Sequence, residues 1–278
     1  MLSYRHSFHA GNFADVLKHL VLVELIHYLQ KKNAGFDYIA THAGAGLYQL
    51  HSSHGEKLQE YRDGIGRLTK LEWPELTDYL QLVAGFNKPD RLSIYPGSPL
   101  IALTLLRPQD RAWLYDLHPT DYDQLRRNTA KFAKVKVFQE DGFKSLLSLM
   151  PPTSRRSLVL IDPSYEVKSD YGAVIRVIQL AHQKFSTGTY ALWYPVVDRH
   201  QIDRLERAIK ATGIRHIQRF ELGVVADGAA PGMTSSGMIV VNPTWGLFDR
   251  MAALLPRLAK KMGRDGAGVY RCDVLAAE

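Results

Sequence analysis

The tetrapeptide Asp162-Pro163-Ser164-Tyr165 directly follows an apolar run at 158–161. An apolar run that ends at Asp-Pro is typical of a strand buried in a parallel sheet. Open α/β sheets bind their ligands at the carboxyl ends of such strands. The Asp162 carboxylate, the Pro163 carbonyl and the Tyr165 ring are suited to gripping a flat ring that carries an amino group. We therefore expect the chemistry of this chain at this position.

A second segment with chemical meaning is the small-residue loop at 41–46 (THAGAG). Glycines such as Gly44 and Gly46 let the backbone approach a ligand closely. A dinucleotide-binding loop needs a third glycine and an acid about 20 residues later. Gln49 occupies that third position and Asp116, the next acid at a strand end, is much further away. These two departures disfavour a dehydrogenase.

Two more acids follow expected strands. Asp116 can accept hydrogen bonds from both hydroxyls of a ribose, with a helix cap as the alternative. Asp141, which precedes Gly142 and Phe143, can accept the amino group of an adenine. A cap on the following helix is an equally good interpretation of Asp141. Glycine loop, ribose acid, adenine acid and Asp-Pro-x-Tyr resemble, in this order, the S-adenosylmethionine-dependent amino-methyltransferases.

The elements that must position these residues alternate along the chain. Apolar residues at helical spacing predict a helix over 13–30, and alternation predicts a strand over 36–41. Residues 51–92 are richer in charge and predict a helical insertion with helices over 56–70 and 75–86. Further strands are expected near 112–117, 134–138, 157–161, 189–194, 215–223 and 236–241. Helices are expected near 99–107, 120–131, 143–149, 171–185, 199–211 and 245–262.

This alternation predicts an α/β fold with a mostly parallel sheet covered by helices on both faces. The last two expected strands have no helix between them, so they can form a hairpin whose final strand runs antiparallel. The division that we expect is 1–50 for the arm, first helix, first strand and glycine loop, 51–92 for the insertion, and 93–278 for the rest of the core.

The composition is that of an ordinary globular protein of 278 residues, 46% hydrophobic and 23% charged. The single cysteine, Cys272, allows no internal disulfide and indicates a reducing compartment, so we expect a cytoplasmic protein. No apolar stretch has the length of a membrane span, and the N-terminus lacks a signal-peptide core. A net charge of +7 favours a polyanionic partner such as nucleic acid.

Motifs spread over nearly the whole chain carry a resemblance to a known family. They are 1–12 (MLSYRHSFHAGN), 14–19 (ADVLKH), 41–46 (THAGAG), 95–102 (YPGSPLIA), 160–163 (LIDP), 190–197 (YALWYPVV) and 236–240 (SGMIV). In these motifs the chain resembles the bacterial 23S ribosomal RNA adenine-N6 methyltransferases of the J type. The resemblance implies a Rossmann-like class I methyltransferase core with a small helical insertion, S-adenosylmethionine as cofactor and 23S ribosomal RNA as partner.

The resemblance also assigns site residues. It implies cofactor contacts at His19, His42, Ser98, Asp116, Asp141, Gly142 and Asp162, with Asp162 as the catalytic acid and Tyr4 as a substrate contact. From the residues themselves we add Gly44 of the glycine loop as a cofactor contact, Pro163 and Tyr165 to the catalytic group, and His6 and Lys18 as contacts to the substrate RNA. The chain departs from the family at Ser164, where the family has proline, and at Asp116, where it usually has glutamate.

The expected chemistry activates an amino nitrogen whose lone pair is delocalised into the adenine ring. Asp162 accepts one N–H, the Pro163 carbonyl accepts another, and Tyr165 stacks on the base. A base in a helix must be flipped out or already unpaired to reach such a pocket. Lys18 is a candidate phosphate contact, together with Arg126 and Arg127.

Alternatives remain open at this stage. A DNA adenine-N6 methyltransferase shares the chemistry, but the insertion at 51–92 looks too small for a target-recognition domain. A catalytically weak RNA-binding module of the same fold has only Ser164 in its favour. The histidine pairs His6/His9 and His51/His54 lack a cysteine partner, so we predict no metal. We expect a monomer.

Overall fold

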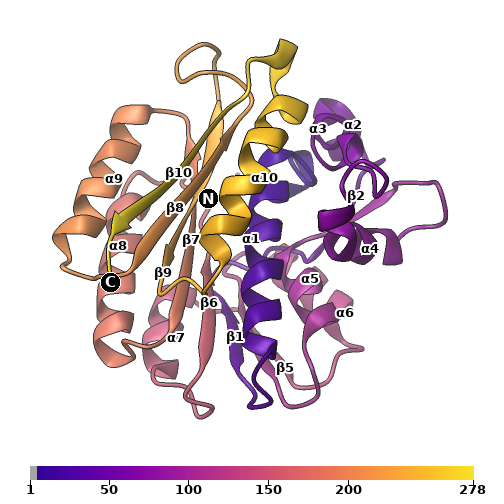
Figure 1. Ribbon diagram of the computed structural model, residues 1–278. Coiled ribbons are helices and arrows are strands. Elements are labelled where there is room, and N and C mark those ends of the chain that lie inside the picture. Colours follow the sequence, from indigo (N-terminus) through magenta and orange to yellow (C-terminus); the bar gives the residue numbers. More distant parts are fainter. Residues whose placement is uncertain (1–4) are drawn as a thin grey trace.

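The structure, a computed structural model, describes residues 5–278 and is built around one large twisted sheet (Figure 1). Its eight strands are β1 (Asp37–Ala40), β4 (Arg111–Tyr115), β5 (Val135–Phe138), β6 (Ser157–Ile161), β7 (Thr189–Val196), β8 (Ile217–Gly223), β9 (Ser235–Val241) and β10 (Val269–Ala276). They lie in the order β10-β8-β9-β7-β6-β1-β4-β5. The order reverses beside β1, and ligands bind open α/β sheets at such a switch point.

The strand directions confirm the mostly parallel sheet. Strands β5, β4, β1, β6 and β7 pair in parallel, and β9 pairs antiparallel with both β7 and β8. The expected hairpin with an antiparallel final strand is therefore present as β8 and β9. Strand β10 pairs antiparallel with β8 at the sheet edge and was not predicted. Its residues are half-buried or exposed and include Arg271 and Asp273, so it lacks the apolar run of the inner strands.

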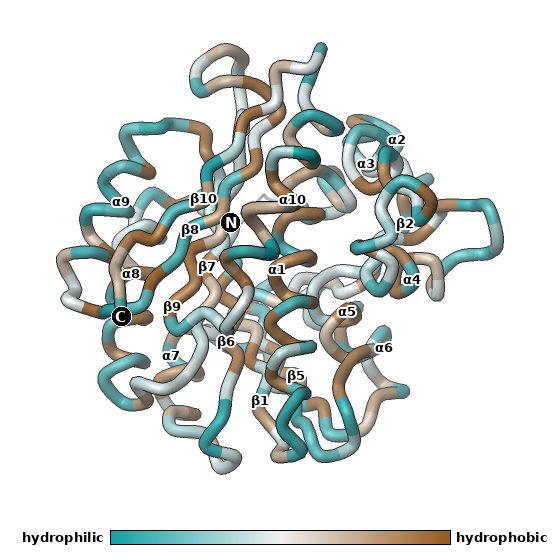
Figure 2. The backbone as a smooth tube through the Cα atoms, in the orientation of Figure 1, coloured by the Kyte–Doolittle hydropathy of each residue, from teal (hydrophilic) through white to brown (hydrophobic). Residues whose placement is uncertain are grey.

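Helices cover both faces of the sheet, as predicted (Figure 1). Helices α1 (Phe13–Gln30), α5 (Ser98–Leu105) and α10 (Leu247–Met262) lie together on one face, and α1 contacts both of the others. Helices α7 (Gly142–Leu149), α8 (Asp170–Lys184) and α9 (Arg199–Ala211) cover the other face, and α6 (Pro119–Thr129) packs beside β5. Helix α1 is buried over most of its length because it is enclosed by the sheet and by α5 and α10, and it carries hydrophilic as well as hydrophobic residues (Figure 2).

Short elements fill the predicted insertion. They are α2 (Ser53–Leu58), α3 (Glu60–Asp63), the 3-10 turns η2 (Ile65–Arg67) and η3 (Pro74–Leu76), and α4 (Thr77–Gly85). Helix α4 confirms the expected helix over 75–86. The single helix expected over 56–70 is wrong, because the chain turns left-handed at Gln59 (φ 51°) and leaves helical geometry again at Gly64.

Gly64 shows why that helix breaks. A Cβ at Gly64 would lie 2.1 Å from the Gly11 carbonyl oxygen, so only glycine lets the insertion approach the N-terminal segment this closely. A two-stranded sheet, β2 (Leu47–Gln49) with β3 (Ile94–Pro96), joins the two ends of the insertion and was not predicted. The division of the chain at 51–92 stays a prediction.

The core fixes where the site can form. Every residue of β6 is buried, as its apolar sequence predicted, and the strand delivers Asp162 at its carboxyl end. The carboxyl ends of β1, β4, β5 and β7 meet the same edge of the sheet, because these strands run parallel to β6 or to its neighbours. Among residues 5–278, no helix is both long and apolar enough to cross a membrane.

Candidate active site

The Asp162 side chain pairs with a lysine that lies 144 residues earlier in the sequence. Lys18, on α1, places its Nζ 2.7 Å from Asp162 Oδ2, and its side chain is only 5% exposed. The same Nζ lies 3.0 Å from Asp15 Oδ1. The Lys18 ammonium is enclosed between two carboxylates and faces the Asp162 side chain, and its role as a contact to the RNA stays a prediction.

Asp15 gathers the N-terminal segment around this pair. Its Oδ2 accepts hydrogen bonds from the backbone N–H of Gly11 and from His6 Nε2, both at 2.9 Å. His6 lies in the 3-10 turn η1 (His6–Phe8), and its ring contacts Tyr48 edge-on at 5.0 Å. The sequence predicts His6 near the substrate. In the structure His6 and Lys18 both contact Asp15, so a single side chain separates them. Tyr4 lies outside the described residues, so its role stays a prediction.

Charge and burial set the ionisation of this cluster. Burial raises the pKa of the Asp162 carboxyl above its usual range, and the charge of Lys18 opposes that rise. Burial acts to raise the pKa of Asp15 as well, but His6 and Lys18 outweigh it and hold that pKa well below its usual range. Burial would lower the pKa of Lys18, yet the two carboxylates raise it instead. Lys18 is therefore a permanent cation at neutral pH.

The glycine loop lies beside Asp116, as expected. Gly44 has φ +63° and donates its backbone N–H to Asp116 Oδ2 at 2.8 Å, while the N–H of His118 reaches Asp116 Oδ1 at 2.9 Å. A Cβ at Gly44 would lie 2.5 Å from the Tyr48 hydroxyl. Each carboxylate oxygen of Asp116 keeps a further lone pair, which suits it to the hydroxyls of a ribose.

The first residues of α7 pack against the 41–46 loop. Asp141 caps the helix by accepting from the N–H groups of Phe143 and Lys144, at 3.0 and 3.3 Å, so the capping interpretation is confirmed. A Cβ at Gly142 would lie 2.0 Å from the Thr41 carbonyl oxygen, which explains the glycine. Burial lowers the pKa of His42 to about 4, so its ring, 4.8 Å from that of Phe143, is neutral near pH 7. The cofactor contacts assigned to these residues stay predictions.

His19 and Ser98 lie deeper than the other candidates. His19 is fully buried, its Nδ1 is 2.7 Å from the Tyr95 hydroxyl, and burial lowers its pKa to about 3. Its Nε2 has no hydrogen-bond partner among the described residues. Ser98 begins α5 and is 4% exposed beside the Tyr38 hydroxyl. Their assignment as cofactor contacts stays a prediction.

Tyr165 does not present a free face to a base in this structure. The ring is only 9% exposed and lies against Tyr171 and Trp193, at centroid distances of 4.5 and 6.0 Å. Its hydroxyl donates to the Trp193 carbonyl at 2.8 Å, and its φ is +55°. Pro163 is buried beside it. The stacking role assigned to Tyr165 stays a prediction.

Comparisons with known proteins identify the family of the chain. A sequence model described as "Ribosomal RNA large subunit methyltransferase D, RlmJ" matches residues 33–275. The chain belongs to the RlmJ family. A ribosomal RNA large subunit methyltransferase J from Escherichia coli K12 is 51% identical over 270 residues, 96% of each chain. One of the same name from Haemophilus influenzae Rd is 47% identical over 281 residues, 100% of each chain.

A solved structure supports the fold over the full length. The crystal structure of a Legionella pneumophila protein has a TM-score of 0.87 to this chain at 35% identity, covering 96% of this chain and 98% of that one. The Rossmann-like class I methyltransferase fold expected from the resemblance is confirmed. RlmJ-family members are methyltransferases, and S-adenosylmethionine is the methyl donor.

The residues present fit that cofactor. The Asp116 carboxylate has lone pairs for ribose hydroxyls, and Gly44 leaves room that a side chain would fill. His19 Nε2 is a buried polar atom without a hydrogen-bond partner among the described residues. No group of three or more His, Cys, Asp or Glu within 5–278 could hold a metal ion.

Sequence reasoning missed the contacts that hold the N-terminal segment in place. Glu60, on α3 of the insertion, accepts from His9 Nδ1 at 3.0 Å and from Asn12 Nδ2 at 2.9 Å. His54 stacks on Phe8 with a centroid distance of 4.2 Å. The only available clue was the histidine and asparagine content of 6–12, which has no local meaning without the insertion beside it.

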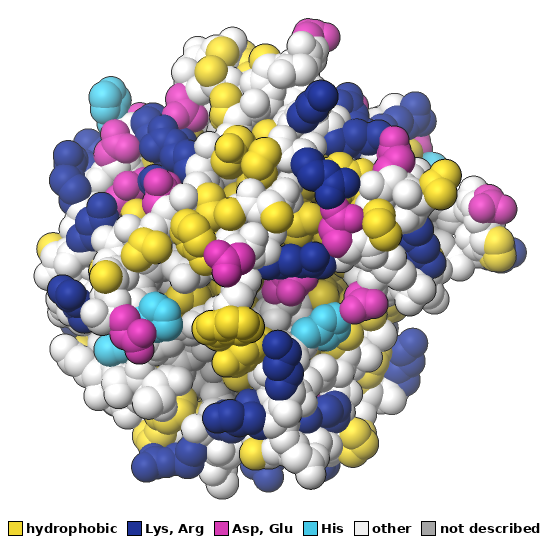
Figure 3. Space-filling view, in the orientation of Figure 1, with side chains coloured by type: hydrophobic (Ala, Val, Ile, Leu, Met, Phe, Trp, Pro, Cys, Tyr) yellow, Lys and Arg dark blue, Asp and Glu magenta, His cyan; other side chains and the backbone are white. Residues whose placement is uncertain are grey.

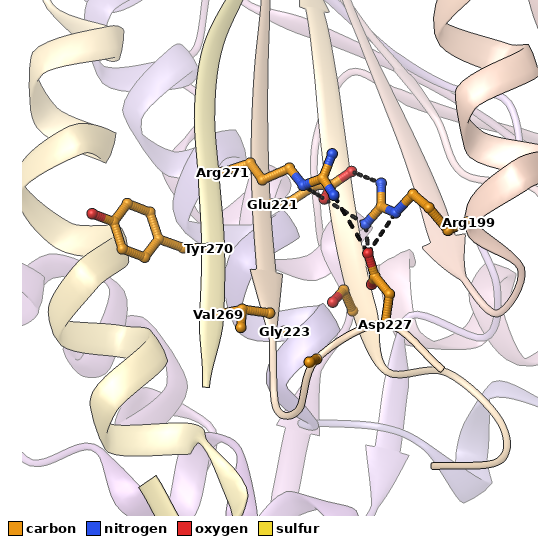
Figure 4. A pocket seen from close by; sticks show the side chains of 9 residues that line it. Arg199, Glu221, Gly223, Asp227, Val269, Tyr270 and Arg271 are labelled. Atoms are coloured by element: carbon orange, nitrogen blue, oxygen red, sulfur yellow. Dashed lines mark hydrogen bonds and ion pairs between the residues drawn. The ribbon is translucent and has the colours of Figure 1, made fainter. Parts of the chain in front are cut away.

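A second polar cluster lies at the same sheet edge, beyond β7 (Figure 4). Arg199 binds Glu221 with both Nη atoms, at 2.9 and 2.8 Å, and Asp227 with Nε at 2.7 Å. Arg271 lies 3.4 Å from both acids. The arginines and carboxylates neutralise one another, so we assign this cluster to holding α9, the 224–234 loop and β10 together.

Proposed function

We propose that this chain transfers the methyl group of S-adenosylmethionine to the N6 atom of an unpaired adenine in large-subunit ribosomal RNA. The RNA class comes from the two relatives, whose names state it. Adenine as the target base and N6 as the atom that accepts the methyl group are proposed from the residues of the site. The observation that carries the proposal is the Asp162 carboxylate, delivered at the end of β6 in an Asp-Pro-x-Tyr sequence and held by Lys18.

The chemistry needs a hydrogen-bond acceptor at the amino group. The bound cofactor supplies an electrophilic methyl on a positively charged sulfur. Asp162 accepts one amino N–H and the Pro163 carbonyl accepts the other, so the nitrogen lone pair turns from the ring toward the methyl. Asp162 or water would take up the proton that the amino group releases on methylation. Placement of groups and charges supplies most of the acceleration.

The burial of Asp162 limits the substrate. Its side chain is 14% exposed, and a paired adenine cannot bring N6 to such a position. The substrate is therefore an unpaired or flipped adenine. Lys and Arg side chains are spread over the face that carries α1 and α10, with acids between them (Figure 3). This distribution supports contacts with RNA phosphates over a broad surface rather than in one narrow patch. The monomeric state and the cytoplasmic location stay predictions.

The test is methyl transfer to protein-free large-subunit ribosomal RNA, followed by mass mapping of the modified nucleosides. We expect N6-methyladenine with the wild-type chain and a rate at least about 100-fold lower with Asp162→Asn. Asp162→Asn should fold, because Lys18 keeps Asp15 as a partner.

Asp37→Asn is the matched control. Asp37 is also a buried acid, but it begins β1 at the opposite edge of the sheet and accepts from Trp113 Nε1 at 2.7 Å. It should retain the wild-type rate per folded molecule. Methylation of another base, transfer only to duplex DNA, or cofactor binding without any transfer by the wild-type chain would contradict the proposal.

A further inference from the structure

Asp15 is a buried carboxylate for which the proposed chemistry has no use. It is 1% exposed, in the first turn of α1. Its Oδ1 lies 3.0 Å from Lys18 Nζ, and its Oδ2 accepts from Gly11 N–H and His6 Nε2. Burying a second charge beside Asp162 is costly unless it serves the site or the fold.

We propose that Asp15 is a positioning residue for methyl transfer: it shares the charge of Lys18 and so keeps Asp162 a strong acceptor for the target amino group. This inference rests on the proposed function. If Lys18 faced Asp162 alone, the pair would form a complete ion pair. Asp162 would then be less basic and a weaker acceptor. With Asp15 on the other side, Lys18 holds Asp162 in place without fully neutralising it.

The groups around Asp162 support this division of charge. Lys18 and Asp15 face it from α1, His6 from η1, Tyr38 from β1, and Tyr165 from its own loop. Burial raises the pKa of both tyrosines, so they are neutral at working pH. Burial is the largest cause that raises the pKa of Asp162, while Lys18 and then His6 act to lower it. Asp15 is the carboxylate on the other side of Lys18, and its charge acts to raise the pKa of Asp162.

The size of the effect follows from the geometry. Lys18 Nζ contacts the two carboxylates at 3.0 and 2.7 Å, so their contacting oxygens are separated by at most about 6 Å. At that separation and an effective dielectric constant of about 20, removing the Asp15 charge lowers the pKa of Asp162 by about two units.

The experiment compares Asp15→Asn with the wild-type chain in two readouts. The first is a carboxyl ¹³C NMR titration, in which Asp162→Asn assigns the resonance of Asp162. The second is the pH dependence of single-turnover methylation of protein-free large-subunit ribosomal RNA. We expect the Asp162 titration and the acidic limb of the rate profile to move to lower pH by about two units, with a lower plateau rate.

Two further variants separate positioning from folding. Asp15→Glu keeps the charge and should return the Asp162 titration toward its wild-type position, even if its rate is reduced. Asp37→Asn removes a buried acid at the far edge of the sheet and should leave the Asp162 titration unchanged.

The possible results are distinct. An Asp162 titration that stays in place in folded Asp15→Asn, or moves to higher pH, overturns the inference. Since the NMR titration needs no turnover, a shift without any adenine methylation by the wild-type chain would support the charge sharing while the proposed function fails.

Discussion

Replacing Lys18 with methionine tests the central electrostatic feature of the site. Methionine preserves most of the aliphatic stem and removes the ammonium. The variant then contains Asp15 and Asp162 without the cation between them, with exposed fractions of 1% and 14%. Removing one partner from a buried ion pair leaves an uncompensated charge, which is strongly destabilising.

The magnitude can be worked from the contacts. The two carboxylates contact the same Nζ at 3.0 and 2.7 Å, so they lie roughly 5 Å apart. At an effective dielectric constant of about 20 their repulsion is about 3 kcal/mol, within the range of about 3–5 kcal/mol for a broken buried pair. We expect Lys18→Met to lower the free energy of unfolding by about 3–4 kcal/mol near pH 7.5. A chain of ordinary stability survives that loss.

The pH dependence gives the sharper test. Without Lys18, repulsion raises the folded-state pKa of one carboxylate above its unfolded value. The resulting penalty is complete above that raised pKa and falls as the pH drops through it, because protonation removes one charge. Urea denaturation near pH 7.5 and near pH 5 should show the difference between wild type and variant shrinking by about 1–2 kcal/mol.

Lys260→Met, which removes an exposed lysine of α10, should be nearly neutral at both pH values. The reasoning is refuted if Lys18→Met is as stable as the wild type near pH 7.5. It is also refuted if the difference in the free energy of unfolding is the same at both pH values.

Three further variants test the surrounding structure. Gly142→Ala places a Cβ 2.0 Å from the Thr41 carbonyl oxygen and should cost about 1–3 kcal/mol, with weaker cofactor binding by calorimetry. Glu60 raises the pKa of His9, so the contact stabilises the fold mainly at pH values below that raised pKa. Glu60→Gln should therefore lower the free energy of unfolding by under about 1 kcal/mol, because solvent screens this partly exposed pair, and denaturation at pH 6 and pH 9 should show the larger loss at pH 6. Tyr165→Phe removes a buried hydroxyl donor and should cost about 1 kcal/mol in thermal unfolding, with methylation retained.

The inner parts of the fold could be predicted because their sequence patterns have one physical explanation. The run at 158–161 is apolar without interruption because β6 is buried on both faces, and 13–30 is apolar because α1 is enclosed. Strand β10 has no such pattern, since an edge strand needs neither face fully buried. The break within 56–70 depends on the close approach of Gly64 to Gly11, and local helical spacing carries no information about it.

The same distinction explains which residues of the site could be predicted. Asp162 and Asp116 could be found from the sequence because each directly follows a strand, and strand ends of a parallel sheet meet at one edge. The partnership of Lys18 with Asp162 joins residues 144 positions apart, and no local pattern specifies it. Asp15 was visible only as part of the N-terminal motif, because a carboxylate in the first turn of a helix is ordinary.

The insertion acts on the site through the N-terminal segment, although its helices contribute none of the acids near Asp162. Glu60 binds His9 and Asn12, and the N–H of Ile65 donates to the Gly11 carbonyl at 2.9 Å. Asn12 caps α1, and the Gly11 N–H binds Asp15. The insertion therefore fixes the turn that orients Asp15, and Asp15 in turn orients Lys18 toward Asp162. A change in the insertion that loosened this turn would reach Asp162, the proposed catalytic acid, through three successive contacts: Gly11 with Asp15, Asp15 with Lys18, and Lys18 with Asp162.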